Sequence, residues 1–193
     1  MDDMSGMKET LHRYLCSARE GLVWKVEGVD EYDAHRPLTS TGTNLLGLVQ
    51  HLAWVEAEYF GVCFGAPFDE APGWDWEAPG TDPNIDLVAE QGREEVLGLY
   101  HRACAWADRT IGSTDLTVTG TVPWWAEDRR HPTLHAMLVH MNSETHRHAG
   151  HADILREGLD GRVGAREGDT NLVGGYDWPA HVARVQEVAD RFR

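Results

Sequence analysis

Cysteine, basic residues and long apolar runs are all scarce in this chain of 193 residues. The three cysteines, Cys16, Cys63 and Cys104, lie far apart without a CxxC pair, which argues against a disulfide framework or a cysteine-based zinc site. Lys and Arg total 17 against 32 Asp and Glu, so the net charge is -15. Because such a surface repels nucleic-acid phosphates and anionic lipids, we expect no nucleic-acid or membrane partner.

No apolar run approaches the roughly 20 residues that a membrane-spanning helix needs. The first residues, Met1 to Ser5, also lack the basic and apolar regions of a signal peptide, so we expect a cytoplasmic protein. The length suits one domain, and a hydrophobic content of 41% is enough for a substantial core. We therefore predict that residues 1–193 form a single domain.

Apolar residues recur at spacings of three and four, which is typical of amphipathic helices. The pattern predicts helices over residues 7–27, 43–63, 83–112, 132–159 and 178–192. Four long helices with little strand signal predict an all-α fold, a four-helix bundle with long inter-helix loops and a short C-terminal fifth helix.

Residues at the helix ends fit these boundaries. The stretch Ser40 to Thr43 offers N-caps for the second helix, and Asp82 and Pro83 suit the start of the third. Gly112 can end the third helix, and Asp177 can cap the fifth.

The long loops contain several tryptophans. Alternation over residues 117–122 is compatible with a short hairpin. The loop tryptophans either wall a pocket or pack under the loops; they are Trp74, Trp76, Trp124 and Trp125.

Histidine is abundant, with 11 residues, and six of them cluster on or beside the fourth predicted helix: His131, His135, His140, His146, His148 and His151. Residues spaced three and four apart share one helix face. One such stripe is apolar at both ends and polar in its middle, and it comprises Met137, Met141, Glu144, His148, His151 and Leu155. A carboxylate and imidazoles that face a core are costly unless something satisfies them, and a metal ion does so well.

Glu144 and His148 are four residues apart and can reach one ion from the same face. His51, at the border of the apolar face of the second helix, can supply a third ligand. Three protein ligands leave coordination positions open, as in catalytic sites. The alternative is a set of hydrogen-bonded core side chains, and His140 and His151 compete as ligands.

Two segments of the chain resemble a known family. The run from His140 to Glu157 resembles the last bundle helix of the DinB-like, YfiT-like metalloprotein superfamily, and Leu48 to Leu52, followed by Trp54, Glu56 and Tyr59, resembles its second helix. Asp177-Trp178 before the last helix is also similar. The resemblance implies a four-helix bundle with a metal at one end of its core.

Many members of that superfamily use three histidines, whereas this chain has Glu at position 144. The departure matches the His/Glu/His set of the mycothiol-dependent maleylpyruvate isomerase branch. The resemblance thus implies His51, Glu144 and His148 as ligands, with zinc as the default ion and nickel, iron or manganese as competitors.

The resulting hypothesis is a metal-dependent enzyme that activates a low-molecular-weight thiol, with mycothiol favoured. The thiol would be transferred to a small electrophilic substrate or would assist its isomerisation. The alternatives are a metal-dependent hydrolase and a metal-binding or small-molecule-binding protein without turnover. The sequence assigns no catalytic residue beyond the ligands and leaves a homodimer open.

Overall fold

The computed structural model describes residues 2–70, 88–170 and 172–193. Within these residues the chain is helical and forms no strand, so the all-α prediction is confirmed. An isolated β-bridge joins Thr119 to Thr133, in place of the hairpin expected over residues 117–122. Among the described residues, none of the helices combines the length and the hydropathy that a membrane-spanning helix requires.

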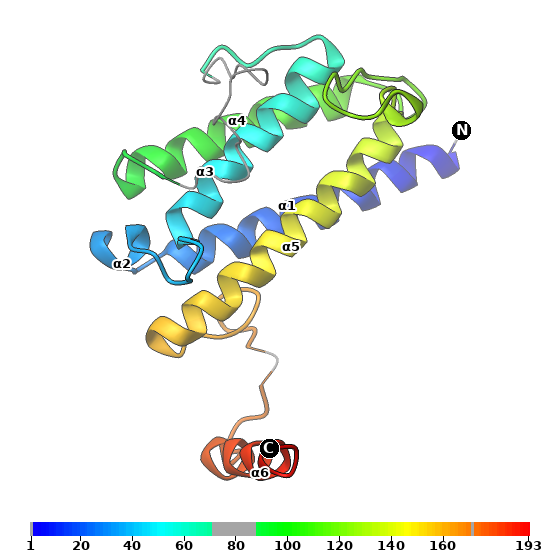
Figure 1. Cartoon of the computed structure of the whole chain (residues 1–193). Coiled ribbons are helices and arrows are strands. Elements are labelled where there is room, and N and C mark those ends of the chain that lie inside the picture. Colours follow the sequence, from blue (N-terminus) through cyan, green and yellow to red (C-terminus); the bar gives the residue numbers. More distant parts are fainter. Residues whose placement is uncertain (1, 71–87, 171) are drawn as a thin grey trace.

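Four long helices form the bundle: α1 (Asp2–Val26), α3 (Leu45–Glu56), α4 (Arg93–Ser113) and α5 (Leu134–Asp160). Helix α1 lies along α5, and α3 lies along α4, while contacts of α3 with α5 and α1 join the two pairs (Figure 1). The candidate ligands come from α3 and α5, so this contact between the pairs positions them.

Several helix boundaries differ from those predicted. A short helix, α2 (Glu31–His35), was not predicted. The predicted second helix instead continues as a π-helix (Ala57–Gly61) and then a 3-10 turn (Val62–Phe64). Helix α4 begins ten residues later than predicted, and the proposed start at Asp82 and Pro83 lies outside the described residues.

The helix ends follow ordinary capping chemistry. The side chain of Asn44, rather than residues 40–43, caps α3 by accepting a hydrogen bond from the Gly47 amide at 2.7 Å. Thr133 caps α5, and Gly161 ends that helix with a φ of 76°, a left-handed conformation that favours glycine. Asp177 caps α6 (Trp178–Asp190), as predicted.

Helix α6 lies apart from the bundle (Figure 1). Its described side chains are exposed except for the half-exposed His181. The elements that position the candidate ligands are therefore α3 and α5, and α6 lies at a distance from both.

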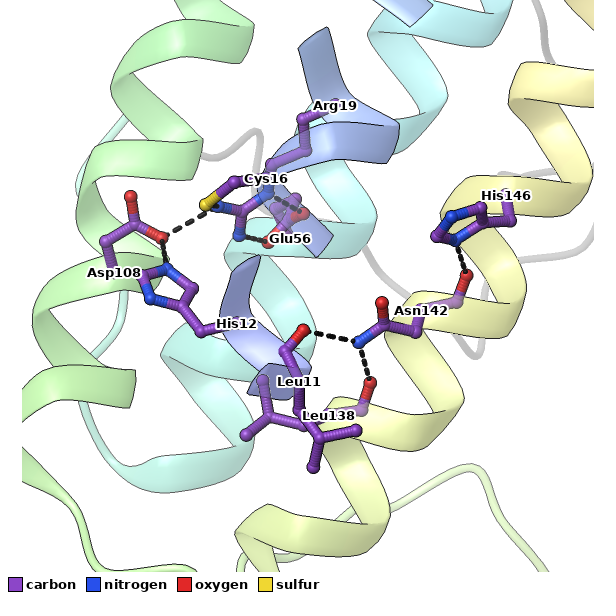
Figure 2. Close-up of polar contacts among 9 residues, drawn as sticks. All are labelled: Leu11, His12, Cys16, Arg19, Glu56, Asp108, Leu138, Asn142 and His146. Atoms are coloured by element: carbon purple, nitrogen blue, oxygen red, sulfur yellow. Dashed lines mark hydrogen bonds and ion pairs between the residues drawn. The ribbon is translucent and has the colours of Figure 1, made fainter. Parts of the chain in front are cut away.

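The core contains two groups of buried apolar side chains, one centred on Leu22, Leu48 and Leu52, the other on Leu15, Phe60 and Met137. A buried ion pair lies among the described side chains of this core. Arg19 of α1 makes two bonds of 2.7 Å to the carboxylate of Glu56, whose side chain is 0% exposed (Figure 2). This pair fixes α1 against the C-terminal end of α3.

Candidate metal centre

The three residues singled out in the sequence lie together between α3 and α5. One donor atom from each of His51, Glu144 and His148 lies within 4.8 Å of the other two. Nε2 of His148 is 2.9 Å from Oε1 of Glu144, and Nε2 of His51 is 3.5 Å from the same oxygen. The two imidazole rings meet edge to face, with centroids 4.7 Å apart. A carboxylate oxygen thus lies between two imidazole nitrogens, a donor set that suits a divalent ion.

The sequence explains why these groups face one another. Helix α3 is apolar over nearly its whole length and is buried. His51 is therefore buried with it, and the His51 side chain is only 2% exposed. On α5 the i, i+4 spacing places Glu144 and His148 on one face. Their side chains are 26% and 16% exposed, so this end of the cluster is within reach of solvent and small molecules.

Glu144 carries the negative charge of the cluster. Its contacts with His148 and His51 hold the pKa of this carboxyl well below its usual range, despite partial burial. Glu144 is therefore ionised at neutral pH. An ionised carboxylate is the form in which a Glu side chain binds a cation.

The two rival histidines lie outside this group of three. His140 is one turn before Glu144, but its ring packs edge to face against Tyr59 and Trp125, with both centroid distances at 5.0 Å. Burial lowers the pKa of His140, which favours the neutral ring. His151 is exposed and meets the ring of His148 at 5.4 Å. Both remain neighbours of the cluster rather than members of it.

An aromatic wall borders the cluster, and we define it as Tyr59, Trp124, Trp125 and His140. Trp125 donates its indole N–H to the Tyr59 hydroxyl at 3.3 Å, and Trp124 lies 5.7 Å from the Tyr59 ring. Tyr59 sits in the π-helix that follows α3, a rare distortion that is frequent at functional sites. Of the two interpretations of these tryptophans, a pocket wall or packing, the structure supports packing on Tyr59 beside the candidate ligands.

Sequence reasoning did not identify the wall as a unit. Tyr59 enters the sequence argument only through the family resemblance, and the spacing of Trp124 and Trp125 does not indicate their partner, because the contact joins loop residues to the π-helix after α3 and to α5. Trp74 and Trp76 lie outside the described residues.

Comparisons with known proteins add one positive finding. The model of a family described as mycothiol-S-transferase matches residues 10–161, which extend from α1 to the end of α5 and include all three candidate ligands. No curated protein matches the chain. The matched region stops before α6.

Proposed function

Because the chain belongs to the mycothiol-S-transferase family and is accordingly a transferase, we propose that it joins mycothiol to a small electrophilic substrate at the cluster of His51, Glu144 and His148. The family supports the thiol and the type of reaction. The metal dependence rests on one observation, the convergence of two imidazoles and an ionised carboxylate from separate helices.

The donor chemistry fits a divalent cation. Two nitrogens and a carboxylate oxygen are ligands that zinc accepts, and nickel, iron and manganese accept them too. Three protein ligands are typical of sites in which a further position binds substrate, whereas structural zinc sites use four. A bound cation would supply charge that lowers the pKa of a thiol and holds it as the nucleophilic thiolate.

The protein's own side chains would then hold the cation and shield the site of transfer. The Nε2 atoms of His51 and His148 both lie close to Oε1 of Glu144, whose negative charge would offset part of the charge of a cation. The aromatic wall packs on Tyr59 beside the cluster and would limit the access of water from that side. In the transfer step the thiol first loses its proton to solvent, and the thiolate sulfur then forms a bond to the electrophilic carbon of the substrate. The bond from that carbon to the leaving atom breaks, and its electron pair stays on the leaving atom; in an epoxide this atom is the ring oxygen, which takes up a proton from solvent.

The cellular setting is part of the same proposal. Cys16, Cys63 and Cys104 are all free thiols. Free thiols and a reduced small-molecule cosubstrate both suit the cytoplasm, which is kept reducing.

The decisive experiment combines metal analysis with a conjugation assay. Purified protein is expected to contain about one equivalent of metal at the cluster and to conjugate mycothiol to a reporter electrophile such as a haloaromatic compound or an epoxide. A chelator should abolish conjugation, and added zinc should restore it. Conjugation that a chelator leaves intact would contradict the metal proposal, and turnover that needs no thiol would identify a hydrolase instead.

Variants locate the activity in the cluster. His51→Ala, Glu144→Gln and His148→Ala should each lose metal and lower kcat/KM by roughly 100-fold or more, which corresponds to about 2.7 kcal/mol of transition-state stabilisation. The matched control is His146→Ala, because His146 lies on the same helix but is exposed and its ring nitrogen hydrogen-bonds the Asn142 carbonyl. Equal losses in the control and in His148→Ala would show that the helix, not the ligand, was perturbed.

A further inference from the structure

A second group of potential metal ligands lies between α1 and α4, outside the cluster already described. His12 and Cys16 are four residues apart on α1 and share one face, and Asp108 reaches them from α4 (Figure 2). One donor atom from each of the three lies within 4.8 Å of the other two. The group therefore combines a thiol, an imidazole and a carboxylate from two helices.

The hydrogen bonding of this group resembles that of the first cluster. Nε2 of His12 lies 2.7 Å from Oδ1 of Asp108, just as an imidazole of the first cluster contacts Glu144. Oδ2 of Asp108 has no partner among the described residues, so the carboxylate keeps an oxygen for a further contact.

Arg19 is the group that would oppose a cation here. Its Nη1 lies 2.7 Å from Oδ1 of Asp108 and 3.9 Å from Sγ of Cys16. However, its guanidinium charge is already matched by the two bonds of 2.7 Å to Glu56. The charge of Asp108 is therefore in excess, before any ionisation of Cys16, and the local balance favours an added positive charge.

A cavity of about 380 Å³ gives access to the group. Cys16, Asp108 and Arg19 line it, together with Glu20, Tyr100 and Cys104 from the two helices. Glu20 adds a further negative charge. An ion that entered through the cavity could keep a water molecule as a fourth ligand, which completes the four-coordinate arrangement that zinc prefers.

We propose that His12, Cys16 and Asp108 bind a thiophilic divalent cation such as zinc, as a second site that ties α1 to α4. Thiolate and imidazole ligands select ions of this class over magnesium or calcium. The absence of a CxxC pair argued against a cysteine-containing site, but that argument holds only for ligands from one segment. Here the third ligand comes from a residue 92 positions away from Cys16 along the chain.

Cobalt(II) is the probe that separates the two sites, because only a thiolate ligand gives cobalt a strong near-ultraviolet charge-transfer band. Wild-type protein titrated with cobalt(II) should bind two equivalents and show this band. Cys16→Ser should lose the band and one equivalent, whereas His51→Ala should lose the other equivalent and keep the band. Cys104→Ser is the matched control, because Cys104 lines the same cavity but is not among the three ligands, and it should keep both.

His12→Gln provides a second variant that removes a ligand from the half-exposed side of the group, and it should weaken cobalt binding there by roughly tenfold or more. Circular dichroism checks that each variant is folded. Wild-type protein without the near-ultraviolet band, or a band that persists in Cys16→Ser, overturns the proposal. Wild-type protein could also bind a single equivalent of cobalt(II) whose near-ultraviolet band is lost in Cys16→Ser. That result supports the second site and counts against the metal role of His51, so the failures of the two proposals are distinguishable.

Discussion

Removal of Arg19 tests the electrostatic reasoning most directly. In Arg19→Met, the apolar part of the side chain is retained but Glu56 is left without its cation. The Glu56 side chain is 0% exposed and loses two hydrogen bonds of 2.7 Å, while Asp108, which is 39% exposed, loses one. Breaking a buried ion pair from one side usually costs about 3–5 kcal/mol, a large part of the roughly 5–15 kcal/mol that stabilises a domain.

The loss of unfolding free energy in Arg19→Met should also depend on pH, and the titration of Glu56 determines whether the loss grows or shrinks as the pH rises. Burial raises the pKa of this carboxyl, and Arg19 offsets part of that increase, so the pKa in Arg19→Met should be higher still. A group whose pKa is raised on folding contributes full stability below its unfolded pKa and loses it as the pH rises toward the folded value. Both proteins should lose stability as the pH rises above the unfolded pKa of roughly 4.3. Relative to wild type, the variant should lose up to about 1.4 kcal/mol more for each pH unit between the folded pKa of Glu56 in wild type and its higher folded pKa in the variant.

Urea unfolding followed by circular dichroism at pH 5, 6 and 7 measures both effects. The matched control is the double variant Arg19→Met/Glu56→Leu, which replaces the pair by apolar groups and should be more stable than Arg19→Met at pH 7. A loss below 1 kcal/mol at pH 7, or a loss that is the same at pH 5 and pH 7, would refute the claim that an uncompensated Glu56 charge is the cause.

Two further predictions concern packing and thiol reactivity. Gly120→Ala should destabilise the protein by about 1–3 kcal/mol in urea unfolding, because a Cβ there would lie 2.6 Å from the Cys63 carbonyl oxygen. Gly150 lies inside helix α5, and a Cβ there would meet nothing within 4 Å, so Gly150→Ala should instead stabilise the protein by about 0.5–1 kcal/mol. Loss of stability in both variants alike would show that the close approach at Gly120 is not what matters. Burial, with the charge of Glu58 as a smaller contribution, raises the pKa of Cys63 to about 12, so its thiolate is rare at pH 8. Brief alkylation of metal-free protein at pH 8, read by peptide mass spectrometry, should therefore modify the more accessible Cys16 well before Cys63, and equal labelling in folded protein would contradict this.

The helical fold and the candidate ligands could be predicted from the sequence because they depend on local periodicity. The i, i+4 spacing of Glu144 and His148 defines a shared face as soon as residues 134–160 form a helix. The burial of His51 follows from the apolar character of α3 around it. The family resemblance supplied what spacing left open, namely the preference for these three over His140 and His151. That the group binds metal stays a prediction.

The boundaries of α3 were not accessible in the same way. The predicted helix over 43–63 has a continuous apolar face, yet the chain passes into a π-helix at Ala57. Helix propensity does not distinguish these turns, and the widened turn is accompanied by tertiary contacts of Tyr59 with Trp125 and His140. No pattern within residues 43–63 contains those partners.

By itself, the sequence determined the helical class, the caps at positions such as Asp177 and the polar stripe on α5, because each depends on residues within a few turns of one another. Only the tertiary structure decided which helices meet. It placed His51 against Glu144 and packed Trp125 against Tyr59. It also paired Arg19 with Glu56 and brought Asp108 close to His12 and Cys16. The physical reason is that helix packing depends on the complementarity of whole faces from distant segments, which no local spacing encodes.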